Sequence, residues 1–155
     1  MVNSIDEALN IIGQQIVDAL REELDKPRSE GKINASGNLS RSVRYEVVGQ
    51  GAEAELQFFW KEYGDAVDEG RSSSKRGGPK QSWRNKIEGW MRFKGFSSFP
   101  GMTTEQTAFV ITRAINKKGY KAKPWIQPAL DKVLNQDFTQ IFSDGIIAEI
   151  NTRLK

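Results

Sequence analysis

The sequence predicts an α+β fold, in which helices pack on a small antiparallel sheet. Three observations predict it. Apolar residues recur at helical spacing near the start of the chain, two short stretches between residues 42 and 60 alternate apolar and polar side chains, and helical spacing returns from residue 81 onward. The length of 155 residues suits one compact unit, so we expect a single domain over residues 1–155.

The first predicted helix is long and runs from Ser4 to about Asp25. Ser4 and Glu7 have the spacing of a capping box, and Pro27 stops the helix after its last turn. The polar stretch 27–40 contains glycine and is predicted to be a loop. Six apolar residues at intervals of three and four form the helix's stripe: Ile5, Leu9, Ile12, Ile16, Leu20 and Leu24.

A β-hairpin is predicted next, with strands over residues 42–48 and 54–60. Apolar side chains alternate with polar ones in both stretches, and the glycines of the 49–51 segment supply the turn between them. Residues 61–69 are expected to form a short helix or turn that ends at Gly70. This hairpin is the predicted sheet of the fold.

Two middle helices follow the hairpin in the prediction. The first covers residues 81–94 and carries Trp83 and Trp90 at helical spacing. The second begins at Thr103 or Thr104, where Thr103 and Gln106 have capping-box spacing, and it ends at Gly119, a residue favoured after the last turn of a helix.

The last part of the chain is predicted to be extended over residues 120–127 and helical from Pro128, because proline is favoured in a first turn. We expect one final helix that continues to Ile150 and bends at Gly145. Its apolar stripe comprises Leu130, Val133, Leu134, Phe138, Ile141, Phe142, Ile146 and Ile150.

The composition excludes several kinds of chemistry. The chain has no histidine and no cysteine, which excludes Ser-His-Asp and Cys-His catalysis, disulfides and the usual zinc, haem and iron–sulfur sites. Its apolar runs are too short to span a bilayer, and its beginning lacks the pattern of a secretory signal. We therefore expect an intracellular or particle-bound protein without a cofactor.

Basic residues concentrate in two segments, although the net charge is only +3. Residues 71–94 contain eight bases and one acid, and residues 113–123 contain five bases and no acid. The 71–80 stretch has no apolar residue and is predicted to be a flexible excursion. Such bases can meet acids of a neighbouring molecule or DNA phosphates. The candidate contact residues are Arg71, Lys75, Arg76, Lys80, Arg84, Lys86, Arg92, Lys117 and Lys118.

Other candidate sites are weaker. The acids Asp65, Asp68 and Glu69 are close in sequence and could bind a cation. Because no second acidic cluster lies nearby in the sequence, we favour the interpretation that they form the solvated end of a helix. Pro79 removes an amide that a phosphate-binding loop at 77–82 needs, so we reject a nucleotide site there.

Aromatic residues alternate with bases between Trp83 and Lys94, which is typical of surfaces that bind single-stranded nucleic acid. Since Trp83, Ile87 and Trp90 have helical spacing, however, we favour a place for these rings in the core.

Three segments, taken in order, resemble the neck proteins of tailed bacteriophages. They are Ser36-Gly37-Asn38-Leu39-Ser40-Arg41-Ser42, the turn from Tyr63 to Gly70, and Pro124-Trp125-Ile126-Gln127-Pro128-Ala129-Leu130. The family is also described as head–tail joining or tail-completion proteins and is related to lambdoid minor tail protein Z. The resemblance covers about residues 5–135. The motif residues to which it assigns a structural role are Gly37, Leu39, Ser42, Tyr63, Gly70, Pro124, Trp125 and Pro128.

The resemblance implies a structural virion protein rather than an enzyme. Such a protein is made in the host cytoplasm and forms a homo-oligomeric ring in the neck, in contact with other head–tail connector or tail proteins. A ring subunit meets its neighbours through two different surfaces. The alternative is a nucleic-acid-binding module that uses the bases of 71–94 and 113–123, and DNA in the neck channel is a further candidate partner. We predict that those bases face acids of a neighbour, chosen from Glu22, Glu23, Asp25, Glu53, Glu55 and Glu62.

Overall fold

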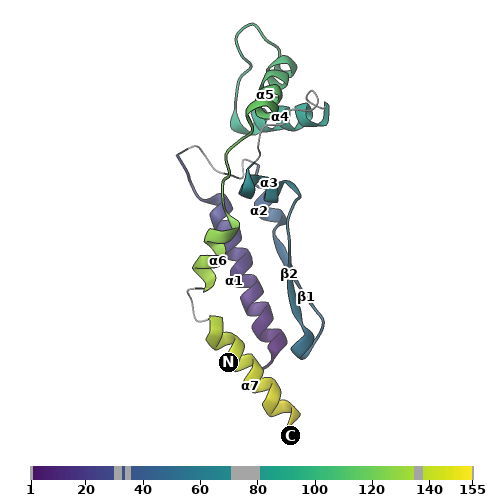
Figure 1. Cartoon of the computed structure of the whole chain (residues 1–155), viewed down its shortest axis with the longest axis vertical. Helices are drawn as coiled ribbons and strands as arrows, with labels where there is room; N and C mark the ends of the chain where they lie inside the picture. The colour runs from purple at the N-terminus through teal and green to yellow at the C-terminus, as the bar shows by residue number, and fades with distance from the viewer. Residues whose placement is uncertain (1, 30–32, 34–35, 71–80, 135–137, 155) are drawn as a thin grey trace.

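The protein has an α+β fold whose elements are described here from a computed structural model (Figure 1). The structure describes residues 2–29, 33, 36–70, 81–134 and 138–154. The predicted excursion at 71–80 lies outside this range. The elements in order are α1 (Ile5–Asp25), α2 (Asn38–Ser42), β1 (Arg44–Val48), a 3-10 turn (Gly51–Glu53), β2 (Glu55–Phe59), α3 (Tyr63–Glu69), α4 (Gln81–Lys94), α5 (Thr104–Lys118), α6 (Ile126–Leu134) and α7 (Phe138–Arg153).

Helix α1 is the centre of the main body, and the predicted apolar stripe is its buried face. It packs against α6 and α7 on one side and against the hairpin on the other (Figure 1). The Ser4 hydroxyl accepts a hydrogen bond from the amide of Glu7 at 3.1 Å, as expected of an N-cap. The Glu7 carboxylate accepts from the amide of Asn3 at 2.6 Å, whereas the predicted capping box would have it accept from the amide of Ser4.

The predicted hairpin is confirmed, with shorter strands than expected. β1 and β2 pair antiparallel from Arg44 opposite Phe59 to Val48 opposite Glu55. The prediction of a strand beginning at Ser42 and of a loop up to residue 40 is wrong at its edges, because residues 38–42 form the short helix α2. Burial explains the difference: Leu39 inserts into the core.

The single final helix of the prediction is replaced by α6 and α7, with residues 135–137 outside the described range. Helix α6 begins at Ile126, two residues before Pro128. Gly145 is buried inside α7, and a β-carbon there would lie 2.7 Å from Cβ of Ala8 and 2.9 Å from the carbonyl oxygen of Ser4. This glycine therefore lets α7 approach the start of α1 closely.

Helices α4 and α5 pack on each other and project beyond one end of the main body, whereas the end of α7 lies at the opposite end of the molecule (Figure 1). The Thr103–Gln106 capping box at the start of α5 is confirmed, with both of its hydrogen bonds formed. Gly119 follows α5 with a φ of 71°. Among the described residues, no helix is long and apolar enough to cross a bilayer.

The expectation that Trp90 belongs to the core is wrong. Its side chain is 39% exposed, whereas the neighbouring Met91 is buried. Helix α4 packs mainly against α5, and this contact leaves part of the Trp90 ring accessible. The side chain of Trp83 lies outside the described part of the structure.

Candidate functional site: the Trp125 junction

The three segments that carry the family resemblance meet at Trp125, which is completely buried. Its indole nitrogen donates a hydrogen bond to the carbonyl oxygen of Gly64 at 3.1 Å. The ring of Trp60 stands edge-on to it, with 5.3 Å between centroids and an angle of 76°. Trp125 is thus held by a polar contact and an aromatic contact from the same short stretch of chain.

Gly64 allows the three segments to approach one another. A β-carbon at this position would lie 2.6 Å from Cδ1 of Trp60, and 3.2 Å from both Cδ1 of Leu39 and Cζ2 of Trp125. Any side chain larger than hydrogen would push these groups apart. We name this cluster of Leu39, Trp60, Gly64 and Trp125, together with Asp68, the Trp125 junction.

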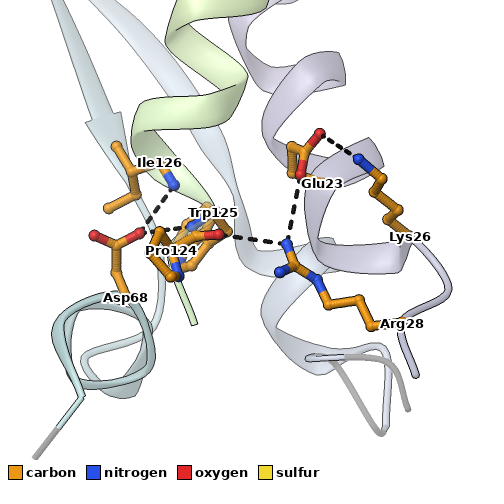
Figure 2. A network of polar contacts seen from close by, with 7 residues as sticks. All are labelled: Glu23, Lys26, Arg28, Asp68, Pro124, Trp125 and Ile126. Atoms are coloured by element: carbon orange, nitrogen blue, oxygen red, sulfur yellow. Dashed lines mark hydrogen bonds and ion pairs between the residues drawn. The ribbon is translucent and has the colours of Figure 1, made fainter. Parts of the chain in front are cut away.

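Asp68 fixes the start of α6 from a distance of 57 residues along the chain (Figure 2). Its Oδ1 accepts hydrogen bonds from the amides of Trp125 at 2.7 Å and Ile126 at 3.0 Å. Amides in the first turn of a helix have no partner within the helix, so this carboxylate satisfies groups that would otherwise be unpaired. The structure thus gives Asp68 the role of a cap.

Gly70 ends α3 against the extended segment before α6. Its φ is 74°, a backbone conformation that residues other than glycine rarely adopt. A β-carbon there would lie 2.5 Å from the amide nitrogen of Ala122. Next to this contact, the amide of Lys123 donates to the carbonyl oxygen of Val67 at 2.9 Å. The turn from Tyr63 to Gly70 and the segment that leads to Trp125 are therefore joined backbone to backbone.

Arg28 ties the end of α1 to the same segment (Figure 2). Its Nη2 donates to the carbonyl oxygen of Pro124 at 3.3 Å and lies 3.5 Å from the Glu23 carboxylate, which also pairs with Lys26 at 3.6 Å. The sequence did not indicate this role of Arg28. Nearby acids suggest an ion pair, but no local pattern indicates a contact with Pro124, which is 96 residues away.

The remaining motif residues have structural contacts or lie at the surface. Gly37 has a φ of 74° before α2, and the Ser42 hydroxyl donates to the carbonyl oxygen of Leu39 at 2.7 Å. Pro124 and Pro128 are exposed on either side of Trp125. Tyr63 is 42% exposed, and the partial burial of its side chain raises the pKa of its phenol.

The acids Asp65, Asp68 and Glu69 do not form a cation site in the structure. Asp65 accepts a hydrogen bond from the Trp60 indole at 2.9 Å, and Asp68 caps α6. Within the described ranges, no group of three or more acids, histidines or cysteines is close enough to hold a metal ion.

The projecting pair α4–α5 carries all five candidate contact residues that the structure describes. Residues 81–118 include seven bases and two acids. Lys86, Arg92, Lys117 and Lys118 are exposed, whereas Arg84 is half-buried with its guanidinium 5.7 Å from the centre of the Phe109 ring. The other predicted contact residues, Arg71, Lys75, Arg76 and Lys80, lie outside the described ranges.

Three of the acids predicted to face a neighbour are engaged within the chain. Glu22 pairs with Lys132, whose hydrogen bond and positive charge lower the pKa of the Glu22 carboxyl. Glu23 holds Lys26 and Arg28, and Asp25 accepts a hydrogen bond from the Ser40 hydroxyl at 2.9 Å. The other three candidate acids, Glu53, Glu55 and Glu62, are exposed.

The chain matches no family model, no curated protein and no solved structure. The resemblance to phage neck proteins therefore rests on the three motif segments of the sequence.

Proposed function

We propose that this chain is a structural protein of the neck of a tailed bacteriophage, where copies of it form a ring that joins the portal side of the head to the tail. The observation that carries the proposal is the Trp125 junction. The three segments that resemble the neck family are separated in the sequence by tens of residues, yet they pack together there. Their side chains serve packing and backbone capping, which suits a scaffold.

The uneven charge of the molecule supports a ring of identical copies. The basic pair α4–α5 projects at one end, and the exposed acids Glu53 and Glu55 lie on the hairpin of the main body. A head-to-tail contact brings such unlike surfaces together and closes into a ring by rotation. Each exposed ion pair contributes only about 0–1 kcal/mol, so charges set the register while apolar side chains such as Phe96, which is exposed, supply most of the affinity.

Charge reversal tests the proposal. The purified chain is expected to form rings as its concentration rises, measured by sedimentation velocity. Lys86→Glu with Arg92→Glu should keep the circular dichroism spectrum and melting temperature but remain monomeric, because both side chains are exposed. The charge-conserving pair Lys86→Arg with Arg92→Lys is the matched control and should assemble. Arg84 is left unchanged because of its contact with Phe109.

A rescue experiment identifies the partner surface. Glu53→Lys with Glu55→Lys, added to the double reversal, should restore rings. A parent chain that stays monomeric at every concentration contradicts the proposal. Reversed acids that never restore assembly contradict the proposed contact.

The second candidate function is binding of nucleic acid by the bases of α4 and α5. The seven bases against two acids in this pair favour it, and DNA in a neck channel makes it compatible with a ring. Duplex DNA should then bind with an affinity that falls steeply with salt, and Lys117→Ala with Lys118→Ala should reduce that salt dependence by about 1–2 units of slope.

A further inference from the structure

A groove of about 880 Å³ lies between α3 and the α4–α5 pair, at the base of the projection. Four aromatic side chains contribute to its walls: Trp60 and Tyr63, which are close in sequence, and Trp90 and Tyr120 from later parts of the chain. The apolar residues between them come from α3, α4 and α5. We name this feature the aromatic groove. Such a concentration of rings in one concave surface is typical of a binding site.

Two of the rings offer accessible faces, and the other two are at least half-buried. Tyr63 is 42% exposed and Trp90 is 39% exposed. Trp60 is held in place by the hydrogen bond from its indole to Asp65 and by its edge contact with Trp125. Trp90 leans on Phe96, with 5.9 Å between ring centroids. Trp60 and Trp90 are thus positioned before any ligand binds, which lowers the entropy cost of binding.

Lysines surround these rings. Lys61 and Lys86 line the aromatic groove, where Glu62 is the acid among the lining residues. A neighbouring hollow shares Val67 and Tyr120 with the groove and adds Lys121 and Lys123. The path that runs from Lys86 past Tyr120 to Lys121 therefore combines aromatic faces with an excess of positive charge.

We propose that the aromatic groove binds single-stranded nucleic acid, with bases stacked on Tyr63 and Trp90 and phosphates placed along Lys61, Lys86 and Lys121. Aromatic faces beside a basic path are the common feature of proteins that bind single strands without sequence preference. A duplex keeps its bases stacked on one another and presents only phosphates to such a groove. The excess of lysine around the groove favours negatively charged single-stranded nucleic acid as its ligand over an apolar helix of a partner protein. The inference deepens the second candidate function and does not depend on ring assembly.

The test measures fluorescence anisotropy of a labelled oligo-dT of about 12 nucleotides, a length within the range that single binding folds cover. Trp90→Ala and Tyr63→Ala should each weaken binding roughly 5- to 20-fold, since each removes a stacking face. Lys86→Ala should reduce the salt slope by about 0.7, the change expected for one lost phosphate contact on a single strand.

Matched controls lie on the same helix outside the groove. Phe93→Ala removes an aromatic ring that is 64% exposed, and Lys94→Ala removes one exposed charge. Both should change oligo-dT affinity less than about twofold. The melting temperature of every variant is compared with that of the parent, and Tyr63→Ala provides an independent test should Trp90→Ala unfold.

Several results would overturn the inference. The first is no saturable binding of oligo-dT at low salt. The second is an equal loss of affinity in the groove and control variants, or duplex binding as tight as oligo-dT binding. The third is Trp90→Ala abolishing self-association without changing oligo-dT affinity, which would make the groove a contact between copies. Oligo-dT binding that depends on Lys117 and Lys118 but not on Trp90 or Tyr63 would also exclude the groove, and would leave the second candidate function standing.

Discussion

Replacing Trp125 by alanine should remove most of the stability of the fold. Truncation of a buried tryptophan costs about 3–5 kcal/mol, because the cavity only partly collapses. The carbonyl of Gly64 loses the indole donor, and an unpaired buried group costs about 1–3 kcal/mol in addition. Domains of this size are stable by about 5–15 kcal/mol, so Trp125→Ala should be close to unfolded at room temperature.

Urea denaturation followed by far-ultraviolet circular dichroism measures this loss. Trp125→Phe keeps a ring but loses the indole N–H, and should fall between the parent and Trp125→Ala. The control is Phe93→Ala, which removes an aromatic side chain that is 64% exposed and should cost less than about 1 kcal/mol. A free energy of unfolding for Trp125→Ala within about 1 kcal/mol of the parent value would refute the reasoning about the junction.

Two pairs of glycines give further predictions, all measured by urea denaturation. Gly70→Ala should destabilise the protein by several kcal/mol, because the new β-carbon would lie 2.5 Å from a backbone nitrogen, whereas Gly101→Ala, at the same φ of 74° but in open space, should cost only about 1–2 kcal/mol. Equal losses at the two positions would contradict the close backbone contact. Gly145→Ala should destabilise the protein through its clash with Ala8, while Gly89→Ala, inside α4 with free space around it, should stabilise by about 0.5–1 kcal/mol. A stabilising Gly145→Ala would exclude the tight packing of α7 on α1.

Local signals in the sequence were sufficient for the elements that have a strong pattern. The stripe of α1 spans nearly six turns, and the alternation of the hairpin is clear in both strands. The short helix α2 has no such pattern, since five residues make little more than one turn. It forms because Leu39 is buried against residues that are distant in the sequence, and propensity alone does not show that burial.

The candidate site was predictable in its parts but not in its assembly. Motif spacing pointed to Leu39, Gly70 and Trp125, yet spacing carries no information on which segments touch. The start of α6 at Ile126 depends on the carboxylate of Asp68, which the sequence analysis interpreted as part of a solvated helix end. The prediction that Trp90 belongs to the core was wrong for a different reason. Helical spacing predicts that residues share a face of a helix, but not whether another element covers that face.

The central claim is that copies of this chain form a ring between the head and the tail of a phage particle. Electron micrographs of particles assembled with a gold-labelled copy of the chain test it most directly. The account predicts label at the junction of head and tail, with several copies around the axis of each particle. Label on the capsid surface or along the tail tube, or particles that carry no label, would contradict it.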